Sequence, residues 1–384
     1  MLGKKGMRQG RHRGRASNVP AYLHGGRRIS HQTIGEIPGR SGTSYGRVPL
    51  HRSDRSRYSD FKRPRMSIIC PALSELPSPP PGKSGWPWDQ ETPEPKTAGS
   101  SQLPRVTVVT PSYNQAEFLE ETLRSVLLQS YPNLEYIVMD GGSTDGSVDV
   151  IRKYEKHLAY WVSEKDRGAS DAVARGFERA TGSVLAYLNS DDPYLPGAIH
   201  AAVAVLETQP ECDVVFGDTY WTDSSGNVLA QRRQTPFSAN GYLYGGADIQ
   251  QPSTFWRRKV YLEVGGMNPE YQTAFDTDLF VRFTVAGARF RHVRQFLSCF
   301  RIHSEAKSST LIDQRATELT RIRSTYLPYG FGSFRARVLR NLARLQRVFW
   351  YALQGDLAWL VTRIPDRLTA NRSGAAVGPK VPYI

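Results

Sequence analysis

Cysteine is scarce in this chain of 384 residues, which contains only Cys70, Cys212 and Cys299. Their wide separation and odd number form neither a metal-binding spacing nor a disulfide framework, which favours a reducing, cytoplasmic environment. The chain also lacks an apolar stretch approaching the roughly 20 residues of a membrane span. Its first 66 residues lack the apolar segment of a signal peptide. The sequence therefore predicts neither a membrane-spanning protein nor a disulfide-rich secreted module.

Acidic residues are scarce at both ends of the chain. Residues 1–66 hold 16 Lys or Arg against 3 Asp or Glu, and residues 320–384 hold 11 against 2. Between residues 101 and 319 the balance reverses, with 21 basic and 27 acidic residues. The N-terminal segment is rich in Gly, Ser and Arg and shows no apolar period, which predicts disorder. Such a tail either binds nucleic acid or an anionic membrane surface, or is a solvated extension.

Three apolar runs, at residues 105–110, 134–139 and 183–188, predict buried strands, and each ends in a polar turn. These turns are Pro111-Ser112-Tyr113-Asn114, Asp140-Gly141-Gly142-Ser143 and Asn189-Ser190-Asp191-Asp192. Helical periodicity between the runs gives the alternation of strand and helix that is typical of a parallel sheet. Ligands of such sheets bind outside the carboxyl ends of the strands, so the three turns predict one cleft.

Further motifs follow in order: QPSTFWRR from Gln251, DTDLFVR from Asp276 and FRIHSEAKS from Phe300. With TVVTPSYNQAEFLEETLRSVLLQSYPNLEYIVMDGGSTDGS and DRGASDAVARGFERATGSVLAYLNSDD, this set covers residues 105 to about 309. It resembles family 2 glycosyltransferases of the GT-A fold. The resemblance implies an α/β protein with a mostly parallel central sheet flanked by helices. It also implies an inverting hexosyltransferase that uses a nucleotide sugar, a UDP-sugar, and a glycan or lipid-linked acceptor hydroxyl.

The sequence divides into five parts on this reading. They are a basic tail (1–66), a Pro-rich linker that lies along the domain (67–103), the GT-A domain (104–310), a helical extension (311–370) and a flexible tail (371–384).

The Asp191-Asp192 pair predicts a site for Mn²⁺ or Mg²⁺, because a departing diphosphate needs its charge bridged and these ions need few protein ligands. The resemblance assigns Asp192 to the metal and Asp191 to the ribose, although Ser190 replaces the first Asp of the strict Asp-x-Asp form. It adds His303 as a metal ligand. Alternatively, residues 190–192 only form a turn and cap a helix that opens at residues 193–196, and His303 is an ordinary core or surface residue.

The resemblance assigns nucleotide binding to Pro111, Tyr113 and Asp140, with Asp171 as a further member. A carboxylate at the end of a strand can accept the imide N–H of uracil or a ribose hydroxyl. Asp140 could instead form an Asx turn, and Asp171 could lie on a solvated first helical turn.

Asp276 aligns with the family's catalytic base, which takes the proton from the acceptor hydroxyl. Gln251, Trp256 and Asp278 are assigned to the donor and acceptor wall, where Trp256 would offer an apolar face to a sugar ring. The alternatives are that Asp276 caps a helix, that Asp278 interacts with the helix dipole and that Trp256 belongs to the core. Lys307 is a candidate for neutralising phosphate charge.

A basic amphipathic helix is predicted from Val338 to Ile364, where apolar residues recur at helical spacing beside arginines. It either lies on a membrane interface, giving a peripherally associated protein, or packs against the catalytic domain.

Two other function classes stay open. A nucleotidyltransferase would carry a Gly-rich, basic phosphate loop after the first strand, and the turn at residues 111–114 is not one. A non-enzymatic nucleic-acid-binding protein would explain the basic tails and leave the acidic turns unexplained, because carboxylates repel phosphate.

Overall fold

The computed structural model describes residues 70–93, 103–245, 248–304, 311–327 and 329–355. The predicted basic tail at 1–66, Lys307, the end of the predicted C-terminal helix and the tail at 371–384 lie outside these residues. The division into five parts stays a prediction.

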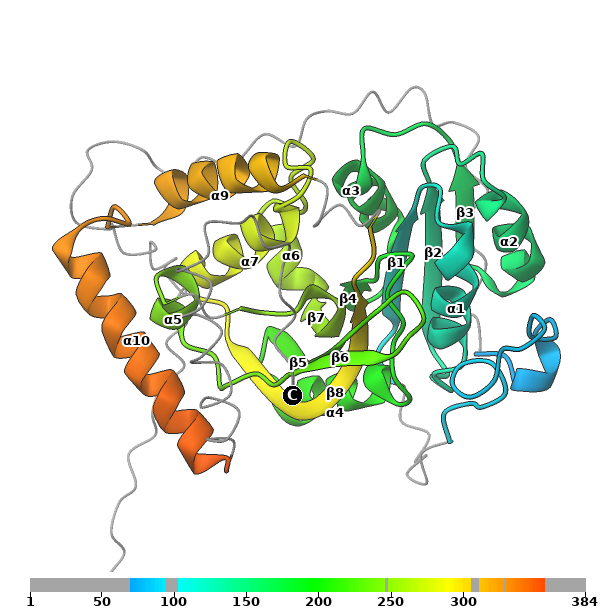
Figure 1. Cartoon of the computed structure of the whole chain (residues 1–384), viewed down its shortest axis with the longest axis horizontal. Helices are drawn as coiled ribbons and strands as arrows, with labels where there is room; N and C mark the ends of the chain where they lie inside the picture. The colour runs from blue at the N-terminus through cyan, green and yellow to red at the C-terminus, as the bar shows by residue number, and fades with distance from the viewer. Residues whose placement is uncertain (1–69, 94–102, 246–247, 305–310, 328, 356–384) are drawn as a thin grey trace, which may run out of the picture. The chain divides into compact units, whose positions relative to one another are not determined.

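A parallel half-sheet forms the first part of the described chain (Figure 1). Its strands are β1 (Val106–Ser112), β2 (Leu134–Asp140), β3 (Tyr160–Ser163) and β4 (Val184–Tyr187), in the spatial order β3-β2-β1-β4. All three pairings are parallel. The predicted strands and their direction are confirmed, although β1 continues through Pro111 to Ser112.

The second half of the sheet mixes directions. β7 (Thr254–Arg257) lies antiparallel to β4 and to β5 (Val214–Thr222), which also pairs antiparallel with β6 (Val228–Arg232). The long β8 (Phe290–Arg301) runs parallel to β5 along its other edge. The fold is therefore α/β with a mixed, mostly parallel sheet, as expected.

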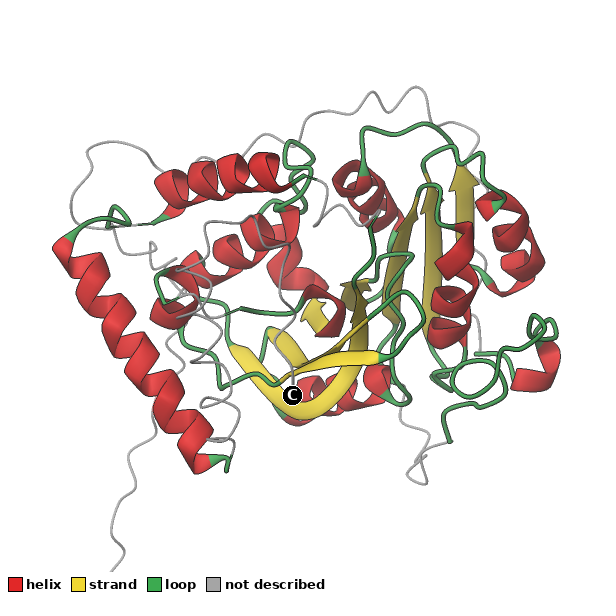
Figure 2. Ribbon diagram, viewed as in Figure 1, coloured by secondary structure: helices red, strands yellow, loops and turns green. Residues whose placement is uncertain are grey.

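Helices lie beside the sheet strands (Figure 2). They are α1 (Ala116–Leu127), α2 (Ser147–Tyr154), α3 (Ala169–Arg179), α4 (Ala198–Thr208), α5 (Ala239–Leu243), α6 (Arg258–Glu263) and α7 (Phe275–Val285). The helix expected to open at residues 193–196 begins only at Ala198, after Gly197 in a left-handed conformation with φ 77°. The motif around Asp276 forms a helix, as predicted.

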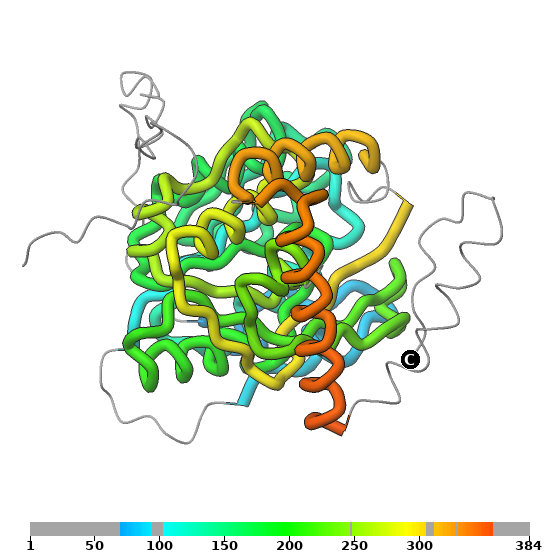
Figure 3. The backbone as a smooth tube through the Cα atoms, turned by 90° about the vertical axis from the view of Figure 1, so that its left-hand side faces the viewer, coloured from blue at the N-terminus to red at the C-terminus, as the bar shows by residue number. Residues whose placement is uncertain are grey.

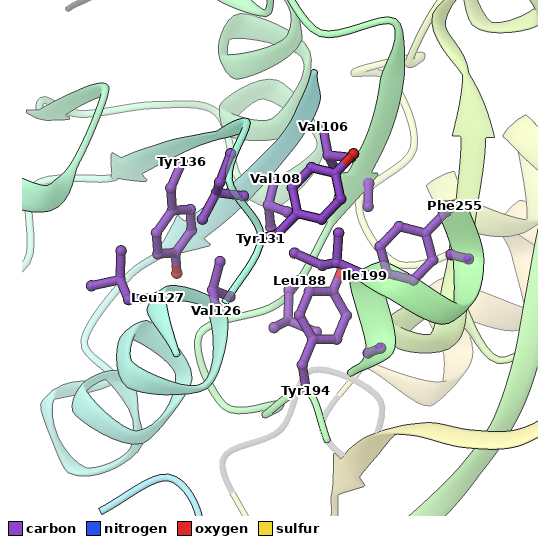
Figure 4. Packing of buried hydrophobic residues seen from close by; sticks show 14 of the residues in the cluster. Val106, Val108, Val126, Leu127, Tyr131, Tyr136, Leu188, Tyr194, Ile199 and Phe255 are labelled. Atoms are coloured by element: carbon purple, nitrogen blue, oxygen red, sulfur yellow. The ribbon is translucent and has the colours of Figure 1, made fainter. Parts of the chain in front are cut away.

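Alternate residues of each strand point to opposite faces of the sheet and enter two apolar clusters. Val106 and Val108 of β1 join one cluster with residues of α1, α2 and α4 (Figure 4). Val109 joins the other cluster, with residues of α3, α6 and α7. Because both faces are covered, the polar groups of the sheet can meet a ligand only at the strand ends.

The Pro-rich segment lies along the domain before β1, as predicted. Arg124 of α1 is 0% exposed and donates to the backbone carbonyls of Pro77, Pro87 and Trp88 at 2.7 to 3.0 Å. This buried guanidinium replaces water as the partner of three loop carbonyls, which fixes the segment on α1.

Two helices close the described chain, α9 (Ile312–Tyr326) and α10 (Phe334–Leu353). α9 docks on α7, since Arg321 and Arg315 of α9 reach Glu270 and the Thr273 carbonyl, which precede α7. None of the described helices is long and apolar enough to cross a membrane.

Candidate active site

The turns after β1 and β2 are joined by direct hydrogen bonds. Asn114 donates its N–H to the Ser143 hydroxyl at 2.8 Å and accepts the Thr144 N–H at 2.9 Å through its side chain. The Gly141 N–H donates to the Ser112 carbonyl at 2.8 Å. Two of the three predicted turns therefore meet at the carboxyl ends of their strands, and the single cleft formed by all three stays a prediction.

Asp140 forms the Asx turn that was the alternative to a nucleotide contact. Its Oδ2 accepts the N–H groups of Gly142 and Ser143 and the hydroxyl of Ser163, at 2.6 to 3.1 Å. Among the described residues, its Oδ1 accepts only the Ser143 hydroxyl, at 2.5 Å. A carboxylate oxygen has two lone pairs, so Oδ1 keeps one acceptor position.

The other predicted nucleotide residues differ in exposure. Tyr113 is 57% exposed, so its ring face is open at the end of β1. Pro111 is buried within β1. Asp171 is 7% exposed and bound by the guanidinium and N–H of Arg167. It is therefore not a solvated helix residue, and its carboxylate is already paired.

His303 meets Asp191 at the end of β4. The imidazole Nε2 lies 3.0 Å from Asp191 Oδ2, and the side chains are 5% and 19% exposed. The ring of Phe118, in α1, lies 4.7 Å from the imidazole centroid and holds it from one side. The structure thus brings His303 to the Asp191-Asp192 turn, as the resemblance implied. The direct partner of His303 is Asp191 rather than Asp192.

Asp192 faces into the protein. It is 1% exposed, and its Oδ1 accepts the Arg301 N–H at 2.8 Å while Asn189 approaches Oδ2 at 3.4 Å. Burial, and after it the charge of Asp191, raise the pKa of the Asp192 carboxyl well above its ordinary value. Oδ1 of this buried carboxylate is bonded to the backbone of β8 and so helps to hold the turn, and the assignment of Asp192 to the metal and Asp191 to the ribose stays a prediction.

Arg301 holds this turn in place and was not singled out from the sequence. Its side chain is 3% exposed and donates to the carbonyls of Asp191 and Ser224 at 2.9 and 2.8 Å. It also pairs with Glu121 of α1 at 3.0 Å. The sequence signal for Arg301 was its position two residues before the candidate ligand His303. Its hydrogen-bond partners could not be predicted, because they lie far away in the sequence.

The donor set at Asp191 and His303 suits a divalent cation that keeps most of its water and phosphate ligands. Neighbouring ligands of an octahedral ion at about 2.1 Å lie about 3 Å apart, which matches the spacing of Asp191 Oδ2 and His303 Nε2. Among the described residues, no group of three or more His, Cys, Asp or Glu side chains could hold a metal ion. The protein would therefore supply two ligands, and the donor's phosphate oxygens and water would supply the rest.

Gln251 lies at the end of β4, whereas Trp256 lies in the core. Gln251 donates to the Tyr187 carbonyl at 2.6 Å and approaches the Asn189 amide at 3.4 Å, which ties η4 (Gln251–Ser253) to the end of β4. Trp256 is 0% exposed and packs against Phe177 and Phe280. The prediction that Trp256 faces a sugar is wrong, because its position on β7 points into the core below the strand ends.

Asp276 lies close to the end of β4. The ring of Phe275 lies 5.7 Å from that of Tyr187, the last residue of β4. Burial raises the pKa of Tyr187 well above its ordinary value, and the charges of Asp276 and Asp192 raise it further. Asp276 is half-buried, and its Oδ1 accepts the Thr277 N–H at 2.6 Å. Its Oδ2 has no hydrogen-bond partner among the described residues.

Asp278 is not part of a substrate wall, contrary to the prediction. It is 0% exposed and pairs with Arg282 at 2.6 Å, one helical turn later in α7. Arg282 also donates to the carbonyls of Val264 and Gly266 at 2.7 Å. The helix cap position is Ala274, so neither Asp276 nor Asp278 is an N-cap.

Glu318 of α9 holds the segment that leads into α7, and sequence reasoning did not find it. Its carboxylate accepts the N–H groups of Gln272, Thr273 and Ala274, each at 2.9 Å. Burial opposes the charged form, but these backbone bonds lower the pKa of Glu318 below its ordinary value. The first turn of α7, which carries Asp276, is therefore anchored by a residue of α9.

Polar and acidic groups gathered at the carboxyl ends of β1, β2 and β4 are typical of an α/β protein that binds a nucleotide there. A model of the glycosyl transferase family 2 matches residues 107–266. An uncharacterized glycosyltransferase of Mycobacterium tuberculosis is 31% identical over 184 residues, which cover 47% of this chain and 70% of that protein. The chain belongs to glycosyl transferase family 2 and is a nucleotide-sugar-dependent enzyme. This decides against the two other function classes.

More distant similarities extend over a larger share of the chain. The chondroitin synthase of Escherichia coli is 22% identical over 265 residues, which cover 68% of this chain and 38% of that protein. The solved structure of the mannosyltransferase PcManGT from Pyrobaculum calidifontis is 19% identical with a TM-score of 0.49, and the match covers 71% of this chain and 84% of that one.

Proposed function

We propose that this chain is a GT-A-type enzyme that transfers a sugar from a UDP-sugar to a hydroxyl of a glycan or lipid-linked acceptor, with inversion. The observation that carries the proposal is the Asp191–His303 pair at the end of β4, together with the half-buried carboxylate of Asp276, whose charge acts on Tyr187 at the end of the same strand. The pair lies on the diphosphate side, and Asp276 is positioned for the acceptor.

The uridine lies against the ends of β1 and β2. The exposed ring of Tyr113 offers a flat apolar face to the base. The remaining lone pair of Asp140 Oδ1 accepts the imide N–H of uracil, while the other bonds of this carboxylate hold it in position. Pro111 shapes the floor of this region as part of β1.

Asp191 and His303 would hold a divalent cation, Mn²⁺ or Mg²⁺. When bound, the cation supplies positive charge to the diphosphate as it leaves the sugar. Asn189 and Gln251 then lie beside the donor sugar, because they join the end of β4 to η4. Arg301 and Asp192 keep the turn in this orientation from below.

Asp276 acts as the general base in a single displacement. Its Oδ2 takes the proton from the acceptor hydroxyl while that oxygen attacks the anomeric carbon on the face opposite the diphosphate. Its Oδ1 stays bonded to the Thr277 N–H, which fixes the rotamer. Inversion follows, because one displacement reverses the configuration at the anomeric carbon.

A panel of UDP-, GDP-, ADP- and CMP-sugars incubated with the full chain and Mn²⁺ tests the proposal. We expect release of UDP from one UDP-sugar, slow by hydrolysis and faster with an acceptor, and loss of release on chelation with EDTA. NMR of the product's anomeric proton should show the configuration opposite to that of the donor. If only a nucleotide sugar with another base releases its nucleotide, the donor is not a UDP-sugar. The membership of glycosyl transferase family 2 would be unaffected.

A further inference from the structure

The outer face of α10 carries a row of large, exposed apolar side chains. Phe334, Leu342, Leu345, Phe349 and Leu353 are 56 to 77% exposed. Residues three or four apart lie on one side of a helix, and with Val338 these residues follow one another at spacings of four, four, three, four and four. Figure 3, in which α10 is the orange-to-red helix, shows no described element in front of it.

A different face of α10 already attaches the helix to the domain. Ala336, Ala343 and Tyr351 are buried. The Arg347 side chain donates to the Gly245 carbonyl at 2.7 Å, and Ala343 lies so close to Gly245 that a side chain there would collide with it. The exposed apolar row is therefore not the surface by which α10 packs on the domain.

Basic residues accompany this row, and acidic residues do not. α10 contains Arg335, Arg337, Arg340, Arg344 and Arg347 and no Asp or Glu. Two of them turn toward the domain, since Arg340 donates to the Phe331 carbonyl at 2.7 Å and Arg347 to Gly245. The other three are exposed beside the apolar row.

We propose that the outer face of α10 lies in the interface of an anionic lipid bilayer. A long helix with a continuous apolar row and flanking arginines fits that surface, because the row enters the acyl boundary and the guanidinium groups reach the headgroups. The net positive charge of the helix complements anionic lipid. An anionic bilayer accounts for both features of this face, the apolar row and the absence of acidic residues.

This placement also brings the membrane near the acceptor side of the active site. Gln346, Arg347 and Trp350 of α10 line one hollow together with Tyr242 and Asp248. The Asp276 carboxylate is close enough to act electrostatically on Tyr242 and Asp248. A lipid-linked acceptor held in the bilayer would approach Asp276 from this side. This approach rests on the proposed function, whereas bilayer binding itself does not.

A fluorescent label on α10 distinguishes this contact from binding by any other basic segment. Leu345→Cys and, as the matched control, Ile312→Cys on α9 place a thiol at positions 67% and 60% exposed. Burial raises the pKa of the native thiols of Cys70, Cys212 and Cys299 to about 12, 11 and 12, so at neutral pH a maleimide dye prefers the new thiol. We expect a blue shift of the Leu345 label on phosphatidylcholine vesicles that contain phosphatidylglycerol, and none for the Ile312 label.

Co-sedimentation of the full chain with the same vesicles supplies the affinities. Arg337→Gln and Arg344→Gln should each weaken binding about fivefold, without touching the core. Leu345→Glu with Phe349→Glu should weaken it on the order of tenfold or more, and Ile312→Glu should change nothing. Circular dichroism checks that each variant is folded.

Several results would overturn the proposal. An unshifted Leu345 label on anionic vesicles would show that α10 does not enter the bilayer. Equal shifts at Leu345 and Ile312 would show that the outer face of α10 is not the specific contact. A lipid-free wild-type dimer that becomes monomeric on Leu345→Glu in analytical ultracentrifugation would assign the face to a second copy. Failure of bilayer binding leaves sugar transfer to a soluble acceptor unaffected, so the two proposals fail independently.

Discussion

The imidazole Nε2 of His303 lies 3.0 Å from the Asp191 carboxylate although 112 residues separate them in the chain. Asp192, one residue later, points the other way, to the backbone of Arg301 at 2.8 Å. These adjacent aspartates therefore have different partners: Asp191 pairs with His303, and Asp192 is bonded to the backbone of β8.

Asp191→Asn and His303→Ala should each weaken the Mn²⁺-dependent part of UDP binding by at least about tenfold, because each removes a metal ligand. Calorimetric titration of UDP with Mn²⁺ and with EDTA measures this without catalysis. Asp192→Asn is the control, since an amide oxygen can still accept the Arg301 N–H. Loss of the Mn²⁺ effect in Asp192→Asn alone would restore Asp192 as the metal ligand.

Arg301→Lys should lower the free energy of unfolding by about 2–4 kcal/mol, because a lysine cannot reach the carbonyls of Asp191 and Ser224 together. Urea unfolding measures the change. Arg291→Lys, on the same strand and 46% exposed in an ion pair with Glu211, should cost less than about 0.5 kcal/mol. Equal costs would mean that Arg301 does not support the turn.

Local sequence patterns predicted the parallel strands, their order of appearance and the polar turns, because continuous apolar runs and turn chemistry are properties of neighbouring residues. They did not show whether Trp256 lies in the core or in the wall of the donor and acceptor site, because an aromatic side chain after a polar stretch suits both positions. They also missed Arg301 and Glu318. The partners of Arg301 at Asp191 and Ser224 are 110 and 77 residues away, and those of Glu318 are 44 to 46 residues away. Only the folded chain brings these groups together.

Glu318→Gln should lower the free energy of unfolding by about 2–3 kcal/mol at pH 7, because an amide group replaces one oxygen that accepts backbone N–H groups. The pKa of Glu318 is lowered on folding. Its charged form therefore stabilises the protein above the unfolded pKa of about 4.3, and this stabilisation is lost as the pH falls through the folded pKa.

Urea unfolding of wild type and Glu318→Gln at several pH values measures this dependence. The difference between the two should be largest at neutral pH and shrink below about pH 4. Glu270→Gln is the matched control, because that carboxylate is 63% exposed and its ion pair with Arg321 contributes little. A difference that stays constant with pH would show that the charge of Glu318 does not hold the start of α7.

Asp276→Asn should reduce the rate of sugar transfer by roughly 10² to 10⁴-fold, because the amide keeps the size and the bond to the Thr277 N–H but cannot take the acceptor's proton. Donor affinity should hardly change, since the diphosphate side is formed by other residues. Single-turnover rates and calorimetric donor binding separate the two quantities.

Asp278→Asn is the control for this prediction. It removes the charge partner of Arg282 in a buried ion pair, so it should lower the free energy of unfolding by about 3–5 kcal/mol and leave the rate per folded molecule nearly unchanged. If a folded, donor-binding Asp278→Asn is inactive while Asp276→Asn turns over, the base is Asp278 and the pairing with Arg282 must open during catalysis. If both variants retain the wild-type rate, the acceptor's proton leaves by another group, and Asp276 is only a residue of the first turn of α7.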